Sequence, residues 1–417
     1  MKKEMSHKGT GSRRMFMLLD MAVLLLAILP VIMSCSRRDI YRADHGVPQC
    51  EITGSLDSLF GSIFKPGEPG GIICVTRNDS VVYKTAFGMA RLDSAERITD
   101  STIFNISSAS KIFTSAALLK LAELGTISLD DPLAKYFPEF PENIFKKITI
   151  RHILTHSSGL PDMRPLNMEQ WNRYLSSHNS VFGHDKDYRL YGTEDEHMQI
   201  FQNLDTVAFE AGTHYQRDDP AYILVAPLIE RITGQSFDRW MRDSIFNPAD
   251  MPDAFYFRAG SRRPRLAHGY TIADPSSRPR SFRSNDGKWD EYDYGEADYF
   301  LTKADRGACS TARGFLRWNK ALRSGKIISD SSLKLMESPI AVTDIPDTWY
   351  GLGTAIYAPD SMPRRIYHMN SNGGFTAMEI YWPDRDVGCV VFSNRNDWKP
   401  MTILHKLDSI FMAKDWI

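Results

Sequence analysis

Residues 104–111 are Phe104-Asn105-Ile106-Ser107-Ser108-Ala109-Ser110-Lys111, and they run directly into an apolar segment from Ile112 to Leu124. If a helix begins near Ser107 or Ser108, Ser108 and Lys111 lie one turn apart on the same face. A hydroxyl beside an amine is a usable nucleophile and base once burial and the helix N-terminus lower the pKa of the amine. The stretch therefore predicts a nucleophile–base pair at the start of a long buried helix, which Gly125 is placed to end.

The spacing of this pair is by itself weak evidence for catalysis. The same interval separates two other pairs in the chain, Ser62–Lys65 and Ser331–Lys334. A serine that caps a helix, followed by a lysine in solvent, gives the same pattern. Only the pair at Ser108 opens a long apolar helix, so the rest of the chain has to decide between catalysis and capping.

Composition places the chain among ordinary globular proteins. Its 417 residues are 42% hydrophobic and 24% charged, with a formal net charge of −1. This length allows two or three domains or one large two-lobed fold. Neither a basic stripe nor a series of stacking aromatics is present, so the sequence predicts no nucleic-acid partner.

The N-terminus has the pattern of a targeting segment. Five Lys and Arg residues precede an apolar run from Met21 to Met33, which is short for a membrane span. The run ends in Ile32-Met33-Ser34-Cys35, which resembles a bacterial lipoprotein cleavage box. We expect residues 1–35 to be a signal peptide with this lipobox, lipidation at Cys35, and residues 36–50 to be a polar tether.

Two alternatives for this N-terminus stay open. The apolar run could be an uncleaved single membrane anchor, and the segment Ser12-Arg13-Arg14-Met15-Phe16 also resembles a twin-arginine signal. Each of these readings takes the chain out of the cytoplasm. The sequence therefore predicts an exported, periplasmic or cell-envelope lipoprotein that is attached to a membrane through a lipid.

The cysteines and histidines predict neither a metal nor a dense set of disulfides. Cys50, Cys74, Cys309 and Cys389 are widely scattered, without the paired spacing of a zinc site. His152 and His156 are four residues apart, but no third ligand accompanies them, so we expect packing or capping roles for both. No phosphate-binding glycine-rich loop is present either, and no cofactor is expected.

The remaining pattern indicates strands at both ends of the chain and helices between them. Segments 71–76, 80–86, 366–368, 377–382 and 387–392 have strand character, whereas 52–64, 220–232 and 403–411 have helix character. Residues 162–205 and 271–298 have the composition of long surface loops. We therefore predict one sheet built from both ends of the chain, with a helical lobe inserted between them.

The chain resembles the penicillin-recognising serine hydrolases, which comprise class C β-lactamases, DD-peptidases and related esterases. The resemblance rests on residues 104–111, on the segments 129–138 and 148–160 that follow them, and on 212–234, 267–270 and 310–312. It implies an α/β fold with an antiparallel sheet covered by helices. It also implies one domain over 51–417, with a sheet lobe at about 51–115 and 300–417 and a helical lobe at about 116–299.

The second motif of this family is Tyr-x-Asn, in which the Tyr helps to move a proton and the Asn contacts substrate. An ungapped count between residues 212 and 234 places Arg217-Asp218-Asp219 on this motif. Arginine stays protonated, so Arg217 cannot act as the base. Asp219 keeps an acceptor but loses the amide donors, and Tyr215 lies two positions early. By the resemblance, Arg217 and Asp219 are substrate-contacting positions.

The third motif of the family is Lys-Thr-Gly or His-x-Gly on a strand beside the nucleophile. Here it is His368-Met369-Asn370, so that His368 matches the variant form and Asn370 replaces the glycine. A side chain at this position is expected to crowd an acyl group that packs on the strand. By the resemblance, the backbone N–H groups of Ser108 and Ser371 form the oxyanion hole, and such donors contribute about 3 kcal/mol each.

Two functional hypotheses follow from the altered motifs. In the first, the protein is an exported serine hydrolase with Ser108 as nucleophile and Lys111 as base, aided by His368 or Asp219. Its substrate is then a β-lactam, a D-Ala peptide or a small ester. Arg217 either lowers the pKa of Lys111 or binds a substrate carboxylate. In the second, the protein is a degraded hydrolase that binds peptidoglycan fragments or a partner without turnover, or that is acylated and stalls.

Overall fold

The computed structural model describes residues 50–161, 194–217, 219–258, 263–273, 282–284, 287–292 and 302–417. The chain divides into two units, residues 1–40 and 41–417, and every described residue belongs to the second. The predicted signal peptide, the lipidation site Cys35 and residues 36–49 of the tether lie outside the described residues. They remain predictions, as do the domain limits. No helix in the described ranges has both the length and the apolar character needed to span a membrane.

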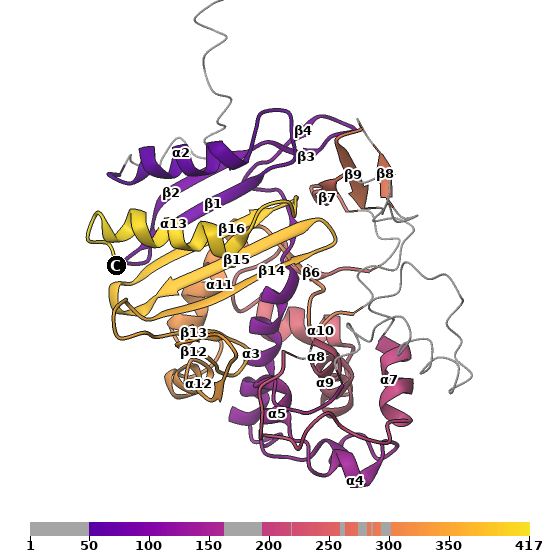
Figure 1. The fold of residues 1–417 in the computed structure, drawn as a ribbon. Helices are drawn as coiled ribbons and strands as arrows, with labels where there is room; N and C mark the ends of the chain where they lie inside the picture. The colour runs from indigo at the N-terminus through magenta and orange to yellow at the C-terminus, as the bar shows by residue number, and fades with distance from the viewer. Residues whose placement is uncertain are drawn as a thin grey trace, which may run out of the picture. The chain divides into compact units, whose positions relative to one another are not determined.

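An antiparallel sheet of eight strands forms the centre of the fold (Figure 1). Its order is β11-β12-β13-β14-β15-β16-β1-β2. The strands are β1 (Gly71–Arg77), β2 (Ser80–Phe87), β11 (Ala341–Val342), β12 (Thr348–Tyr350), β13 (Ala355–Tyr357), β14 (Arg365–Asn372), β15 (Phe375–Trp382) and β16 (Val387–Ser393). Because β1 pairs with β16, both ends of the chain contribute to one sheet, which confirms the predicted fold class.

The local sequence explains the hairpin at the N-terminal end of this sheet. Asn78 and Asp79 both have positive φ, 49° and 61°, which is the backbone conformation of a tight hairpin turn. Asn and Asp tolerate this conformation better than other residues with a Cβ atom. Every residue of β16 is buried, as expected for a nearly continuous apolar strand that is covered on both faces.

Helices cover both faces of the sheet (Figure 1). On one face lie α2 (Thr53–Ile63) and α13 (Pro400–Met412), where Phe411 packs edge-on against Trp382 of β15 at 5.2 Å between ring centroids. On the other lie α3 (Ser110–Glu123) and α11 (Ala312–Arg323), where Phe315 packs edge-on against Phe392 of β16 at 5.4 Å. These contacts bury aromatic side chains on both sides of the sheet and contribute to its stability.

Most of the other described helices follow α3 and lie away from the large sheet (Figure 1). They are η2 (Leu133–Lys135), α4 (Glu142–Phe145), α5 (Ile150–Leu154), α7 (Glu194–Gln202), α8 (Asp219–Ile223), α9 (Val225–Thr233), α10 (Phe237–Met241) and η3 (Arg242–Phe246). Near the C-terminus, α12 (Asp330–Met336) and η4 (Pro383–Arg385) complete the set. The helix predicted at 220–232 is divided between α8 and α9, and Gly234, with a φ of 66°, ends it.

Two segments that the sequence predicts as loops contain regular structure. Within 271–298, β7 (Tyr270–Ile272), β9 (Trp289–Tyr292) and β8 (Phe282–Ser284) form a three-stranded sheet. Trp289 is fully buried beneath the guanidinium of Arg395, 4.4 Å from the ring centroid, so a distant contact and pairing with β7 and β8 hold a strand that has no apolar period. Within 162–205, α7 occupies Glu194–Gln202, and residues 162–193 lie outside the described ranges. The loop predictions are wrong for these parts.

Three short strands bring distant segments to the start of α3. Phe104–Asn105 (β5) pairs with Ala308–Ser310 (β10), which also pairs with Phe255–Tyr256 (β6). A further pair, β3 (Met89–Arg91) and β4 (Glu96–Arg97), lies apart from them in the topology. The 3₁₀ turn η1 (Ser107–Ala109) follows β5 and packs against β14. The predicted nucleophile is therefore held between the helical part and the large sheet.

Candidate active site

The turn that carries Ser108 has an unusual backbone conformation. Ser107 has a positive φ of 53°, which is rare for a residue with a Cβ atom and costs of order 1 kcal/mol. Two side chains hold it in place. The backbone N–H of Ser107 donates to Asn105 Oδ1 at 2.8 Å, and Ser110 Oγ donates to the carbonyl of Ser107 at 2.6 Å. The local polar residues therefore maintain a strained turn that carries Ser108 and leads into α3 at Ser110.

Ser108 and Lys111 form a buried pair. A hydrogen bond of 3.3 Å joins Lys111 Nζ to Ser108 Oγ. Lys111 is 2% exposed and Ser108 is 7% exposed. By contrast, Lys65 is exposed and donates to the carbonyl of Gly61 instead of contacting Ser62. Burial and direct contact thus distinguish the Ser108 pair from another pair with the same spacing.

The backbone of residues 304–305, just before β10, surrounds the amine of Lys111. Lys111 Nζ donates to the carbonyl oxygen of Asp305 at 3.2 Å. Thr114, one turn further along α3, donates to the carbonyl of Ala304 at 3.1 Å. The ring of Tyr222 lies 5.3 Å from Nζ and is itself oriented by a hydrogen bond from its hydroxyl to the carbonyl of Leu154. These contacts hold the amine beside Ser108.

Asn370 is the second side chain in contact with the Ser108 hydroxyl. Its Nδ2 lies 2.5 Å from Ser108 Oγ, although 262 residues separate the two positions in the chain. Within the described part of the chain, Lys111 and Asn370 are the two hydrogen-bond partners of this oxygen. The position where the resemblance implies a glycine is therefore occupied by an amide that reaches the nucleophile.

His368 lies on the same strand as Asn370 but directs its ring nitrogens elsewhere. Nδ1 is 3.3 Å from a carboxylate oxygen of Glu379 on β15, and Nε2 donates to the carbonyl of Gly353. A carbonyl oxygen only accepts, so Nε2 carries a proton. Gly353 has a φ of 83°, and a Cβ atom there would lie 2.0 Å from Ser115 Oγ on α3. His368 thus ties β14 to β15 and to the segment that packs against α3.

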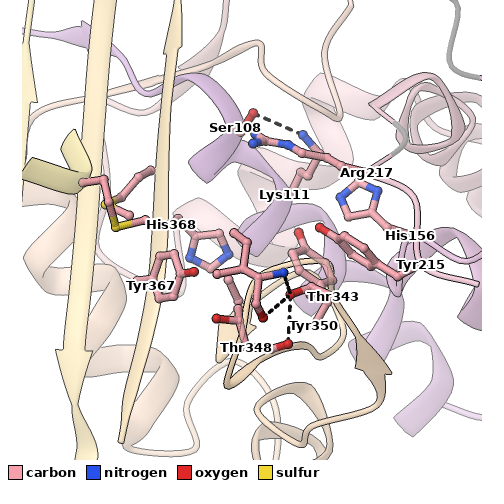
Figure 2. A pocket seen from close by; sticks show the side chains of 14 residues that line it. Ser108, Lys111, His156, Tyr215, Arg217, Thr343, Thr348, Tyr350, Tyr367 and His368 are labelled. Carbon is pink, nitrogen blue, oxygen red and sulfur yellow. Dashed lines mark hydrogen bonds between the residues drawn. The ribbon is translucent and has the colours of Figure 1, made fainter. Parts of the chain in front are cut away.

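The second motif lies at the opposite side of the site. Arg217 and Tyr215 both line the cavity next to Ser108, and the Arg217 side chain extends toward Ser108 and Lys111 in Figure 2. The backbone of this segment is held by a hydrogen bond from Gln216 N–H to the carbonyl of His156, at 2.9 Å. Asp219 begins α8, but its side chain and the whole of Asp218 lie outside the described residues.

A cavity of about 170 Å³ opens beside Ser108 and Lys111 (Figure 2). Aromatic side chains form much of its wall: the His156 ring is buried between Tyr222 and Tyr350, and Tyr215 packs against the Tyr350 ring at 5.7 Å between centroids. Tyr367 of β14 lines the cavity as well. The cavity therefore offers apolar surface with several hydroxyl groups, next to the nucleophile.

Positive charge dominates the ionisable groups of this cavity. Lys111 and Arg217 line it, and none of the described lining residues is Asp or Glu. Burial raises the pKa of Tyr367, while a hydrogen bond with Thr348 and the charges of Arg365 and Arg217 oppose this, so its hydroxyl stays neutral at physiological pH. The cavity is suited to a ligand that is anionic or neutral.

The other predicted residues are placed as follows. Ser371 lies near the end of β14, and its hydroxyl is 2.8 Å from Thr376 Oγ1 of β15. The structure thus brings Ser108, Lys111, Asn370 and Arg217 to one site, with His368 oriented away from the hydroxyl. No group of three potential metal ligands occurs among the described residues. His152 accepts the N–H of Thr149 at 3.1 Å in a capping box, which confirms the predicted capping role.

Sequence reasoning did not identify the contributions of Tyr222, Tyr350, Tyr367 and the Asp305 carbonyl to this site. Every residue has a backbone carbonyl, so the sequence does not show which carbonyl contacts Lys111. The tyrosines belong to separate helices and strands that only the fold brings together, and no spacing marks them.

Comparison with known proteins identifies the family of the chain. A family model described as beta-lactamase matches residues 56–408. Penicillin-binding protein 4* of Bacillus subtilis is 24% identical over 349 residues, which covers 82% of this chain and 72% of that protein.

Solved structures show the same fold at lower identity. A penicillin-binding protein from Bacillus halodurans superposes with a TM-score of 0.66 and 20% identity, over 88% of this chain and 99% of that one. D-amino acid amidase from Ochrobactrum anthropi SV3, in complex with D-phenylalanine, has a TM-score of 0.67 and 22% identity, over 87% and 98%. With a family model that spans most of its length, the chain belongs to the beta-lactamase family.

Proposed function

We propose that this protein is a serine hydrolase that cleaves an amide or ester through an acyl-enzyme on Ser108, with Lys111 as the base. The observation that carries the proposal is the buried contact of 3.3 Å between Lys111 Nζ and Ser108 Oγ. Relatives named as a penicillin-binding protein and a D-amino acid amidase support an amide or ester substrate. Nucleophile and base within hydrogen-bond reach are the minimum arrangement for covalent catalysis.

In the proposed reaction, neutral Lys111 accepts the proton of the Ser108 hydroxyl while Oγ attacks the substrate carbonyl. The negative charge that develops on the carbonyl oxygen is stabilised by the backbone N–H groups of Ser108 and Ser371. Lys111 then returns the proton to the leaving group as the carbon–heteroatom bond breaks. Water hydrolyses the resulting ester by the reverse transfer through the same amine.

Some of the groups around Lys111 favour its neutral form and others favour its charged form. Burial and the neighbouring charge of Arg217 favour the neutral amine. The Asp305 carbonyl and the face of the Tyr222 ring favour the ammonium form. We propose that Arg217 helps to maintain the neutral form, because the side chain lines the same small cavity.

The proton-transfer role of His368 remains a prediction. Because its ring nitrogens contact Glu379 and Gly353, we propose a positioning role, in which His368 holds β14 and therefore Asn370 and Ser371 beside the nucleophile. The predicted export and lipid attachment also remain part of the proposal, on the N-terminal sequence pattern alone.

Labelling of Ser108 tests the proposed function directly. The full chain is incubated with a fluorophosphonate, and its intact mass is measured beside that of a Ser108→Ala variant. We expect one adduct per native chain and none in the variant, because only an activated hydroxyl reacts at a useful rate. Native protein that is folded and stays unlabelled would show that Ser108 is not activated.

The second candidate function, binding without turnover, is favoured by Asn370 and Arg217, which replace a glycine and a proton-carrying tyrosine. The two candidates differ after acylation. A working hydrolase releases its acyl group and recovers its original mass, whereas a protein that is acylated and stalls keeps the adduct. The time course of the mass after excess p-nitrophenyl acetate is removed distinguishes these two outcomes.

We propose that Arg217 also favours anionic substrates, because it lines the cavity as a positive charge, and replacing it with glutamine tests this. We expect the ratio of kcat/KM for p-nitrophenyl hemisuccinate to that for p-nitrophenyl acetate to fall about 10-fold, since a charge-assisted contact is lost. Arg313→Gln, which removes an exposed arginine on α11, is the matched control and should leave the ratio unchanged. An equal ratio in native and Arg217→Gln proteins would contradict a role for Arg217 in substrate binding.

A further inference from the structure

The cavity and Asn370 lie at different parts of the Ser108 side chain. The cavity is lined by Ser108, Lys111 and Arg217, and by Tyr367, His368 and Met369 of β14. Asn370 is not among its lining residues, yet its amide lies 2.5 Å from Ser108 Oγ. The Ser108 hydroxyl therefore has the open cavity on one side and the Asn370 side chain on another.

The strand that carries Asn370 is held firmly on both sides. Asn370 lies opposite Ala377 of β15 in the register, and its neighbour on the same face of the strand, His368, is tied to Glu379 and Gly353. β14 cannot withdraw without breaking these contacts. Rotation of the Asn370 side chain is therefore the direct way to make space beside Ser108 Oγ.

A substrate needs space on both sides of its carbonyl. The carbonyl carbon has to approach the attacking oxygen to about 3–3.5 Å, with one substituent on each side. The cavity accommodates one substituent, and Asn370 occupies the approach on its own side of Oγ. This steric argument is independent of which amide atom faces Ser108, because exchanging nitrogen and oxygen leaves the occupied volume the same.

We propose that Asn370 is a specificity-determining residue that limits the substituent on its side of the scissile carbonyl to a small one. Ser108 then reacts with small linear esters in preference to bulky fused-ring amides such as penicillins. This inference rests on the proposed function, since it concerns the same acylation. Its basis is the position of one side chain in this chain, at a point where a glycine would leave the approach open.

Two substitutions separate the volume of Asn370 from its hydrogen bond. Asn370→Gly removes both the side-chain volume and the amide donor. Asn370→Leu removes the donor but keeps a side chain of similar size. The second-order rate of acylation is measured for native protein and both variants with a fluorescent penicillin and with p-nitrophenyl acetate. Thermal unfolding establishes that each variant is folded, because glycine within a strand is destabilising.

We expect the ratio of penicillin to acetate rates to rise at least about 10-fold in Asn370→Gly, equivalent to roughly 1.4 kcal/mol of barrier. In Asn370→Leu the ratio should stay near or below the native value. An unchanged or lower ratio in the glycine variant would overturn the inference. A similar rise in both variants would also overturn it, because it would assign the effect to the lost hydrogen bond.

The fluorophosphonate adduct distinguishes failure of this inference from failure of the proposed function. If Ser108 is labelled in folded native protein but the ratio does not change, only the role of Asn370 is wrong. If Ser108 is unlabelled in native protein and in both variants, the hydrolase proposal and the inference are wrong together.

Discussion

Replacing Lys111 with methionine is expected to lower the rate of Ser108 acylation about 10³-fold, which is within the usual contribution of a general base. Lys111 is fully buried, and its amine contacts Ser108 Oγ at 3.3 Å. Methionine has a similar length and suits an apolar interior, so the fold should be retained while the proton acceptor is lost. The burst of p-nitrophenol from p-nitrophenyl acetate, followed by stopped flow, measures the acylation rate.

The chain provides a matched control for this substitution. Lys65 follows Ser62 at the same spacing but is exposed and contacts the carbonyl of Gly61, so Lys65→Met should acylate at the native rate. A Lys111→Met variant that keeps more than a tenth of the native rate would exclude Lys111 as the base. The proton would then have to pass through another group, of which Asp219 and His368 are the predicted candidates.

The largest expected effect on stability comes from the ion pair between Arg365 of β14 and Asp408 of α13. Both side chains are 4% exposed, and Arg365 Nη1 donates to Asp408 Oδ2. The guanidinium also lies 4.1 Å above the ring of Tyr357. Asp408→Ala leaves the arginine charge buried without its partner, so the free energy of unfolding should fall by about 3–5 kcal/mol.

Urea denaturation followed by tryptophan fluorescence measures this loss. Arg385→Ala is the control, because it removes one partner of the exposed ion pair with Asp415 and should change the free energy of unfolding by less than about 0.5 kcal/mol. Burial raises the pKa of Asp408 even though Arg365 opposes this, so desolvation of the pair is costly. The double variant Arg365→Met/Asp408→Leu should therefore recover most of the lost stability. A loss below 1 kcal/mol in Asp408→Ala would contradict the account.

Local sequence determined those features that depend on neighbours in the chain. The strands β1 and β2 and the helix that follows Ser108 agree with predictions from periodicity, and the turn at Asn78 and Asp79 and the end of α9 at Gly234 follow from local backbone preferences. Each depends on contacts or backbone preferences within a few residues. The resemblance over most of the chain added the arrangement of the sheet, which the structure confirms.

Tertiary structure alone decided which polar residues act together. The Ser108 and Ser62 pairs have the same spacing, and only packing against residues 304–305 and Tyr222 buries the first. Periodicity likewise does not indicate the strand at Trp289, because the strand depends on pairing with β7 and β8 and on a contact with the distant Arg395.

The contact between Asn370 and Ser108 joins positions 262 residues apart, and its length of 2.5 Å depends on how β14 packs against η1. The sequence by itself determined the identity of these two residues and, through the resemblance, the expectation that Asn370 would crowd the site. Their direct hydrogen bond was decided by the tertiary structure, because residue type and local pattern carry no information on the distance between side chains from different segments.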